Sequence, residues 1–106
     1  MKVHKLSEMK GGWFVGDFLP TSLRTKNFEV ACKYYKAGDK EAAHVHKVAT
    51  EITLIAKGSV LMNALTFNEG DIIILEPGEV SDFYAIEDTV TMVVKIPSIK
   101  DDKYFT

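Results

Sequence analysis

Residues 38–58 read GDKEAAHVHKVATEITLIAKG and carry the most informative spacing in the chain. His44 and His46 are two residues apart, so on a β-strand both side chains point to the same side. Glu51 lies five residues beyond His46, an odd offset that would turn it away from the histidines on one unbroken strand. We therefore expect the chain to turn at residues 47–50 and to return as a neighbouring strand, which brings two imidazoles and a carboxylate together.

Two histidines and one carboxylate form a recurrent ligand set for Fe(II), Mn(II), Ni(II) or Zn(II). The H-x-H pair alone is weak support for a metal site, because two exposed histidines on a strand edge would read the same. Gly38 and Gly58 add fixed positions on either side of the pair and make a chance match less plausible. We therefore interpret His44, His46 and Glu51 as candidate metal ligands.

The flanking sequence alternates with the two-residue period of β-strands. Residues 27–36, NFEVACKYYK, predict a half-buried strand in which Phe28, Val30, Cys32 and Tyr34 share one face. Residues 71–75, DIIIL, are a continuous apolar run that predicts a strand buried on both faces. Further strands are expected at residues 13–18, 50–56, 59–62, 65–67, 81–86 and 89–96. Short strands at this spacing predict an all-β sandwich or barrel, and we expect the charged tail, IKDDKYFT, to pack loosely or to cap one end.

The spacing G-x5-H-x-H-x4-E-x6-G resembles the first signature of the cupins, which are small β-barrels of jelly-roll type. All five fixed positions are present, at Gly38, His44, His46, Glu51 and Gly58. The resemblance covers roughly residues 28–96. It implies a single-domain jelly-roll β-barrel over residues 1–106, with its core at roughly residues 27–96.

The second cupin signature, G-x5-P-x-G-x2-H-x3-N, is only partly present. Gly70 and Gly78 match, whereas Ser81 stands where the resemblance implies the last metal-binding histidine. A one-residue bulge would turn the neighbouring Asp82 inward as a further ligand, and the alternative is that Asp82 is a solvated strand residue. Ser81, Phe83 and Tyr34 are candidate lining residues for a small-molecule cavity, although core packing accounts for the two aromatic residues equally well.

Composition narrows the function classes. The chain has 106 residues, a formal net charge of −2, 46% apolar and 26% charged residues, which is typical of a globular domain and not of a disordered chain. The slightly negative charge excludes a basic nucleic-acid module, and no apolar run is long enough for a membrane span. Cys32 is the only cysteine, so an intrachain disulfide is excluded; the lack of a secretory leader pattern and the single thiol predict a cytoplasmic protein.

The cupin resemblance implies two classes of function. In the first, the chain is a metal-dependent enzyme that uses Fe, Mn, Zn or Ni on a small polar organic molecule such as a sugar or a carboxylic acid. Its reaction and its catalytic residues remain open. In the second, the chain is a non-catalytic ligand-binding or protein-interaction domain, because Ser81 replaces a metal ligand. The aromatic stretch around Trp13 needs cover, which predicts either a homodimer or packing onto its own barrel.

Overall fold

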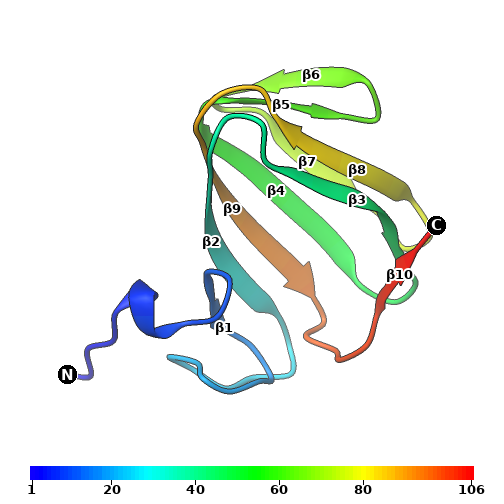
Figure 1. Cartoon of the computed structure of the whole chain (residues 1–106). Coiled ribbons are helices and arrows are strands. Elements are labelled where there is room, and N and C mark those ends of the chain that lie inside the picture. The colour runs from blue at the N-terminus through cyan, green and yellow to red at the C-terminus, as the bar shows by residue number, and fades with distance from the viewer.

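The computed structural model describes all 106 residues, which form two five-stranded antiparallel β-sheets that face each other (Figure 1). Sheet A has the strand order β1-β2-β9-β4-β7, and sheet B has the order β10-β3-β8-β5-β6. A 3-10 helix at Leu6–Glu8 precedes the strands. The strands are β1 Trp13–Val15, β2 Glu29–Tyr35, β3 Lys40–His46, β4 Thr50–Lys57, β5 Ser59–Met62, β6 Leu65–Asn68, β7 Ile72–Leu75, β8 Val80–Ala85, β9 Thr89–Ile96 and β10 Lys103–Phe105.

The all-β jelly-roll prediction is confirmed, and the strands predicted between residues 50 and 96 match the observed bounds to within one residue at each end. The turn expected between β5 and β6 is present at Asn63 and Ala64, whose φ angles are 50° and 63°. Two consecutive residues of positive φ are typical of the two-residue hairpin turn that matches strand twist. The expected edge strand near the N-terminus is present as β1, which pairs with β2.

The inner faces of the two sheets are apolar at one end and polar at the other. The fully apolar cluster lies around Ile55 of β4 and is formed with Val60, Met62, Phe83 and Ala85. Toward the turn between β3 and β4 the inward positions are instead occupied by ionisable side chains, among them His44, His46, Glu51 and Lys95. A polar interior needs partners for its charges, so this end of the barrel is where a functional site is expected.

Two predicted burial patterns are wrong, because outward-facing apolar side chains of sheet A are exposed. Residues 71–75 predict a strand buried on both faces, but the outward-facing Ile72 and Ile74 of β7 are 63% and 53% exposed. On β2, Glu29 and Ala31 point inward while Tyr34 is 71% exposed. The outer face of sheet A is thus apolar, so hydrophobicity alone does not identify the inner face.

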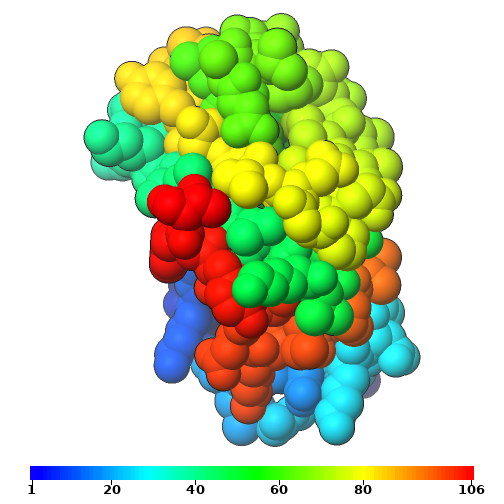
Figure 2. Space-filling view, turned by 90° about the vertical axis from the view of Figure 1, so that its right-hand side faces the viewer, coloured from blue at the N-terminus to red at the C-terminus, as the bar shows by residue number.

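The C-terminal tail does not pack loosely. Its residues form β10, which pairs with β3 and extends sheet B; Lys103 lies opposite His46 and Phe105 lies opposite His44. Figure 2 shows the C-terminal residues in red lying against the green surface of the β3–β4 region. The tail is therefore a structural part of the polar end of the barrel. The structure contains no helix with the length and hydrophobicity needed to cross a membrane.

Candidate metal centre

The structure brings the three candidate ligands together. One potential ligand atom from each of His44, His46 and Glu51 lies within 4.8 Å of the others. The chain turns after His46 as expected, but β3 and β4 do not pair as neighbours: β3 belongs to sheet B and β4 to sheet A. The histidines and the glutamate therefore face each other across the barrel, which allows convergence despite their odd spacing.

Each histidine is oriented by a hydrogen bond from its other ring nitrogen. His44 Nδ1 lies 3.0 Å from the carbonyl oxygen of Ala42, and His46 Nδ1 lies 3.0 Å from that of Asp102. A carbonyl oxygen only accepts, so both Nδ1 atoms carry the proton and both Nε2 atoms keep a free lone pair. Metal-ligating histidines are usually held in this way.

His46 Nε2 is buried, has no hydrogen-bond partner and lies 3.9 Å from Glu51 Oε1. Burial lowers the pKa of His46, and the nearby ammonium of Lys95 lowers it further. The imidazole is therefore neutral at pH 7 and presents an unpaired lone pair toward a carboxylate. An unpartnered buried nitrogen is costly, and a metal ion between His46 and Glu51 would remove that cost.

Asp102 organises the turn that carries the centre. Its carboxylate accepts hydrogen bonds from three consecutive backbone N–H groups, those of Lys47, Val48 and Ala49, at 2.9–3.2 Å. Burial alone would raise the pKa of Asp102, but these N–H groups outweigh it and hold the pKa below its usual range. Its backbone carbonyl is also the acceptor for His46. Asp102 is thus a positioning residue that sequence reasoning missed, because only the pairing of β10 brings it here.

A β-bulge on β3 adds a further carboxylate to the interior. Glu41 pairs with Phe83 and His44 pairs with Ser81, so two residues of β3, Ala42 and Ala43, lie opposite the single residue Asp82. The extra residue lets Glu41 and His44 face inward together although they are three apart. The bulge considered at Asp82 is not present; the irregularity lies on β3 instead.

Glu41 is held in its ionised form. Tyr35 Oη donates a hydrogen bond of 2.6 Å to Glu41 Oε1, and Lys33 Nζ lies 3.9 Å from the same atom. Burial alone would raise the pKa of Glu41, but the bond from Tyr35 and the charge of Lys33 outweigh it and lower the pKa. Burial and the bond to Glu41 raise the pKa of Tyr35, so its hydroxyl remains a donor. Nothing in the sequence spacing singled out these three residues.

The remaining predicted site residues divide between the inside and the outside of the barrel. Ser81 and Phe83 are buried and line a cavity of about 30 Å³ together with Tyr35, Glu41, His44 and Glu51. The Ser81 hydroxyl donates to the backbone oxygen of Asp82 at 2.7 Å, which occupies its only proton. This volume holds only one or two water molecules.

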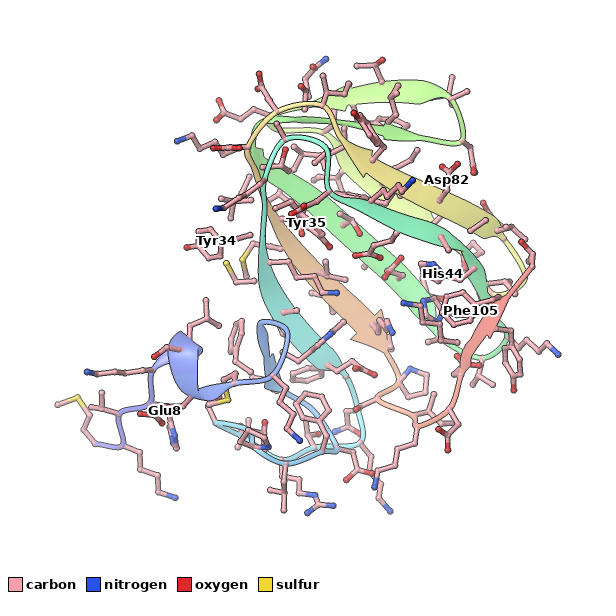
Figure 3. The ribbon with its side chains drawn as sticks, viewed as in Figure 1. Glu8, Tyr34, Tyr35, His44, Asp82 and Phe105 are labelled. Atoms are coloured by element: carbon pink, nitrogen blue, oxygen red, sulfur yellow. The ribbon has the colours of Figure 1, made fainter.

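Two of the predicted site residues point away from the centre. Asp82 is exposed, and its carboxylate accepts a hydrogen bond from Asn63 N at 2.8 Å, because β8 alternates regularly and turns position 82 outward. Tyr34 lies on the outer face of β2, and the neighbouring Tyr35 lines the cavity in its place (Figure 3). The alternative of a solvated Asp82 agrees with the structure, whereas Asp82 as a ligand and Tyr34 as a lining residue of the cavity at the centre do not.

Comparison with solved structures identifies the fold. An uncharacterised protein with a double-stranded β-helix domain from Klebsiella pneumoniae superposes with a TM-score of 0.70 at 21% identity, covering 77% of this chain and 72% of that one. An RmlC-like cupin from Shewanella frigidimarina gives 0.66 at 12% identity, with 73% and 72% covered. The DMSP lyase DddQ from Ruegeria pomeroyi gives 0.73 at 17% identity, covering 89% of this chain and 49% of the lyase.

No protein-family model matches the sequence, and no curated protein matches it either. The structural likeness nevertheless extends over about three quarters of the chain and includes proteins named as cupins. The resemblance carried by Gly38, His44, His46, Glu51 and Gly58 is thus confirmed at the level of the fold: this chain has the jelly-roll, double-stranded β-helix fold of the cupins.

Proposed function

We propose that the protein is a metal-dependent cupin in which His44, His46 and Glu51 hold a divalent transition metal. The observation that carries the proposal is the buried, unpartnered Nε2 of His46, which faces Glu51 at 3.9 Å. Two nitrogen donors and one carboxylate suit Fe(II), Mn(II), Ni(II) or Zn(II). Three protein ligands leave coordination positions open for a small molecule, and the bound metal would act as a Lewis acid there.

We assign the proton-handling role to Glu41. Its carboxylate is ionised, lines the same cavity as His44 and Glu51, and is fixed by Tyr35. A general base needs an unprotonated group within reach of the reacting molecule. Asp82 is the other unassigned acidic residue that borders the cavity, but its carboxylate is exposed and accepts from Asn63 N. The substrate class in this proposal is a small polar organic molecule, because ionisable and hydroxyl side chains, among them Glu41, His44 and Ser81, surround the centre.

The experiment is metal binding by calorimetry, with Zn²⁺ or Mn²⁺ titrated into chelator-treated protein. Wild type is expected to take up one equivalent. His44→Ala and His46→Ala are expected to abolish binding, because each removes one of three ligands. His4→Ala is the matched control, because His4 is the third histidine and is exposed near the N-terminus. Unchanged uptake in both site variants would contradict the proposal.

The alternative is a non-catalytic binding domain. It is favoured by Ser81, whose hydroxyl is bonded to the backbone of Asp82 instead of facing the centre, and by the small cavity. Glu41→Gln separates the two alternatives. An enzyme that uses Glu41 as a base would lose turnover while keeping its metal, whereas a binding domain would keep its ligand affinity.

We also propose a homodimer that forms through the outer face of sheet A. This face carries exposed apolar side chains, including Ile72, Ile74 and Tyr34. Apolar surface of this kind is uncommon on a monomer unless a partner covers it. Light scattering is expected to give a dimer for wild type and a monomer for Ile74→Lys. Leu65→Lys, at a 61% exposed site on sheet B, is the control and should leave the dimer intact.

A further inference from the structure

A second cavity lies outside the barrel, between the N-terminal segment and the outer face of sheet A. Its volume is about 430 Å³, and it shares no lining residue with the cavity at the candidate metal centre. Figure 1 shows the N-terminal segment, in blue, beside β2. Sites for small molecules typically have volumes of about 300–1,000 Å³, so this cavity is large enough for a ligand of its own.

Strand alternation gives this cavity an apolar floor. Cys32 of β2 and Met92 of β9 lie directly opposite each other in the register, so their side chains are neighbours on one face of the sheet. Ala31, Thr91 and Val93, which flank them along the two strands, are buried. Since successive side chains point to opposite faces, Cys32 and Met92 project from the outer face of sheet A. The floor is therefore on the far side of the sheet from the candidate ligands.

The N-terminal segment adds apolar walls to this floor. Leu6 and Met9 belong to or follow the 3-10 helix, and with Phe14 of β1 they line the cavity. The segment is tied to the sheet next to the floor, because the N–H of Cys32 donates to the carbonyl oxygen of Gly12 at 3.0 Å. Five of the nine lining residues are thus apolar and come from three separate parts of the chain.

The charged groups that line the cavity all have the same sign. Lys2 and Lys5 line it, and none of its nine lining residues is acidic. Glu8, the only acidic residue among the first ten, is not one of them. Neither lysine has an ion pair within 4.0 Å. An apolar cavity with unpaired cations at its edge is complementary to a ligand that is apolar at one end and negative at the other.

We propose that this cavity binds an amphiphilic anion, a molecule with an apolar body and one anionic group, such as a medium-chain fatty acid. The apolar body lies against Cys32 and Met92, where it is removed from water. The anionic group lies at Lys2 and Lys5, which a neutral ligand would leave without a partner. This site is independent of the proposed metal centre, because the two lie on opposite faces of sheet A.

The test is calorimetry on chelator-treated protein, titrated at pH 7 with octanoate, hexanoate and the neutral 1-octanol. Wild type is expected to bind one equivalent of octanoate, about tenfold more tightly than 1-octanol, because two exposed cations contribute. Hexanoate should bind about tenfold more weakly than octanoate, because it buries two methylene groups fewer. Equal affinity for octanoate and 1-octanol would show that the lysines do not recognise the ligand, and the inference would be wrong.

Substitutions in the N-terminal segment locate the site. Lys2→Gln and Lys5→Gln should each weaken octanoate binding about threefold and leave 1-octanol binding unchanged. Leu6→Asp should abolish octanoate binding, because it places a carboxylate in the cavity; Leu6 is 37% exposed, so the fold tolerates the change. Lys10→Gln is the matched control, because Lys10 is an exposed lysine of the same segment that does not line the cavity. Equal losses in Lys5→Gln and Lys10→Gln would reflect net charge alone and contradict the assignment.

Cys32 reports on the cavity directly, since it is the only cysteine and lines the floor. Octanoate should slow the reaction of Cys32 with 5,5′-dithiobis(2-nitrobenzoate), with half-maximal protection at the Kd from calorimetry. Octanoate that binds without protecting Cys32 would lie elsewhere, which would refute the inference. A second copy of the chain is the competing occupant: Cys32 would then react in the Ile74→Lys variant but not in wild type, and the inference would be wrong.

Discussion

Replacing Asp102 with alanine tests how far the C-terminal segment supports the proposed metal centre. The Asp102 carboxylate accepts from the N–H groups of Lys47, Val48 and Ala49. Ala49 is only 1% exposed, so in Asp102→Ala its N–H loses its partner and cannot be rehydrated, at about 1–3 kcal/mol. The other two groups are exposed and lose about 0.5–1 kcal/mol each. We expect a total loss of about 3 kcal/mol in the free energy of unfolding.

The assay is urea denaturation at pH 7, together with Zn²⁺ affinity. Loosening the turn disturbs the carbonyl that orients His46, and changes of this kind weaken metal binding by about 10–100-fold. Asp101→Asn is the matched control, because Asp101 is exposed and its φ of 58° is tolerated by asparagine. If Asp102→Ala unfolds at the wild-type midpoint and binds Zn²⁺ within twofold of wild type, the reasoning is refuted.

The contribution of Asp102 to the free energy of unfolding should depend on pH in a direction that its pKa fixes. The folded pKa of Asp102 is below its ordinary value of 3.8, so the stability it contributes is present above that value. The contribution is lost as the pH falls through the folded pKa. The difference in unfolding free energy between wild type and Asp102→Asn should therefore be full at pH 7 and should narrow in strong acid. A difference that grows on acidification would contradict the assignment.

Three further changes test other parts of the site. Tyr35→Phe should raise the pKa of Glu41, as measured by NMR titration, and should lower the free energy of unfolding by about 1–2 kcal/mol at pH 7, because Glu41 loses its donor. This loss of stability should fade as the pH drops through the folded pKa of Glu41. An unchanged titration of Glu41 would disprove the link. Ser81→His, at the position opposite His44, should raise Zn²⁺ affinity about tenfold in calorimetry by adding a ligand. Overpacking of the 30 Å³ cavity should at the same time lower the free energy of unfolding in urea by about 1–3 kcal/mol. Unchanged affinity would show that position 81 does not reach the metal. Gly58→Ala should destabilise the protein by about 2–4 kcal/mol in thermal melts, because the new Cβ would lie 2.5 Å from a backbone oxygen. The Cβ of Gly38→Ala meets nothing within 4 Å, so this variant should lose only about 1 kcal/mol, for its positive φ. Equal losses of stability in the two variants would argue against the steric account.

Local spacing was enough to predict the cluster of candidate ligands, because His44, His46 and Glu51 lie within eight residues and one reversal of the chain brings them together. The same short range explains why the strands from residue 50 onward are placed so well. Each is identified by its own alternation, or by the apolar run at residues 71–75, and by the turn residues that flank it. What the sequence did not indicate is that the reversal crosses from one sheet to the other.

The rest of the site depends on pairings that spacing does not record. Glu41 faces inward because of a bulge on β3, which changes the parity of the strand between Glu41 and His44. Asp102 and Lys103 reach the centre through the pairing of β10 with β3, more than fifty residues away in sequence. Tyr34 was assigned to the interior because its face of β2 is the more apolar one, but that face is the outer surface of sheet A.

The pairing of β10 with β3 links the docking of the C-terminal strand to the state of the proposed metal centre. The proposed metal binding at His46 and docking of the C-terminal strand share the carbonyl of Asp102, so each would favour the other by the same free energy. A cation that binds more tightly when the strand is docked must also hold the strand more firmly. Hydrogen exchange of the β10 amides then reports on occupancy of the centre, and a fusion that pulls the strand away would release the metal.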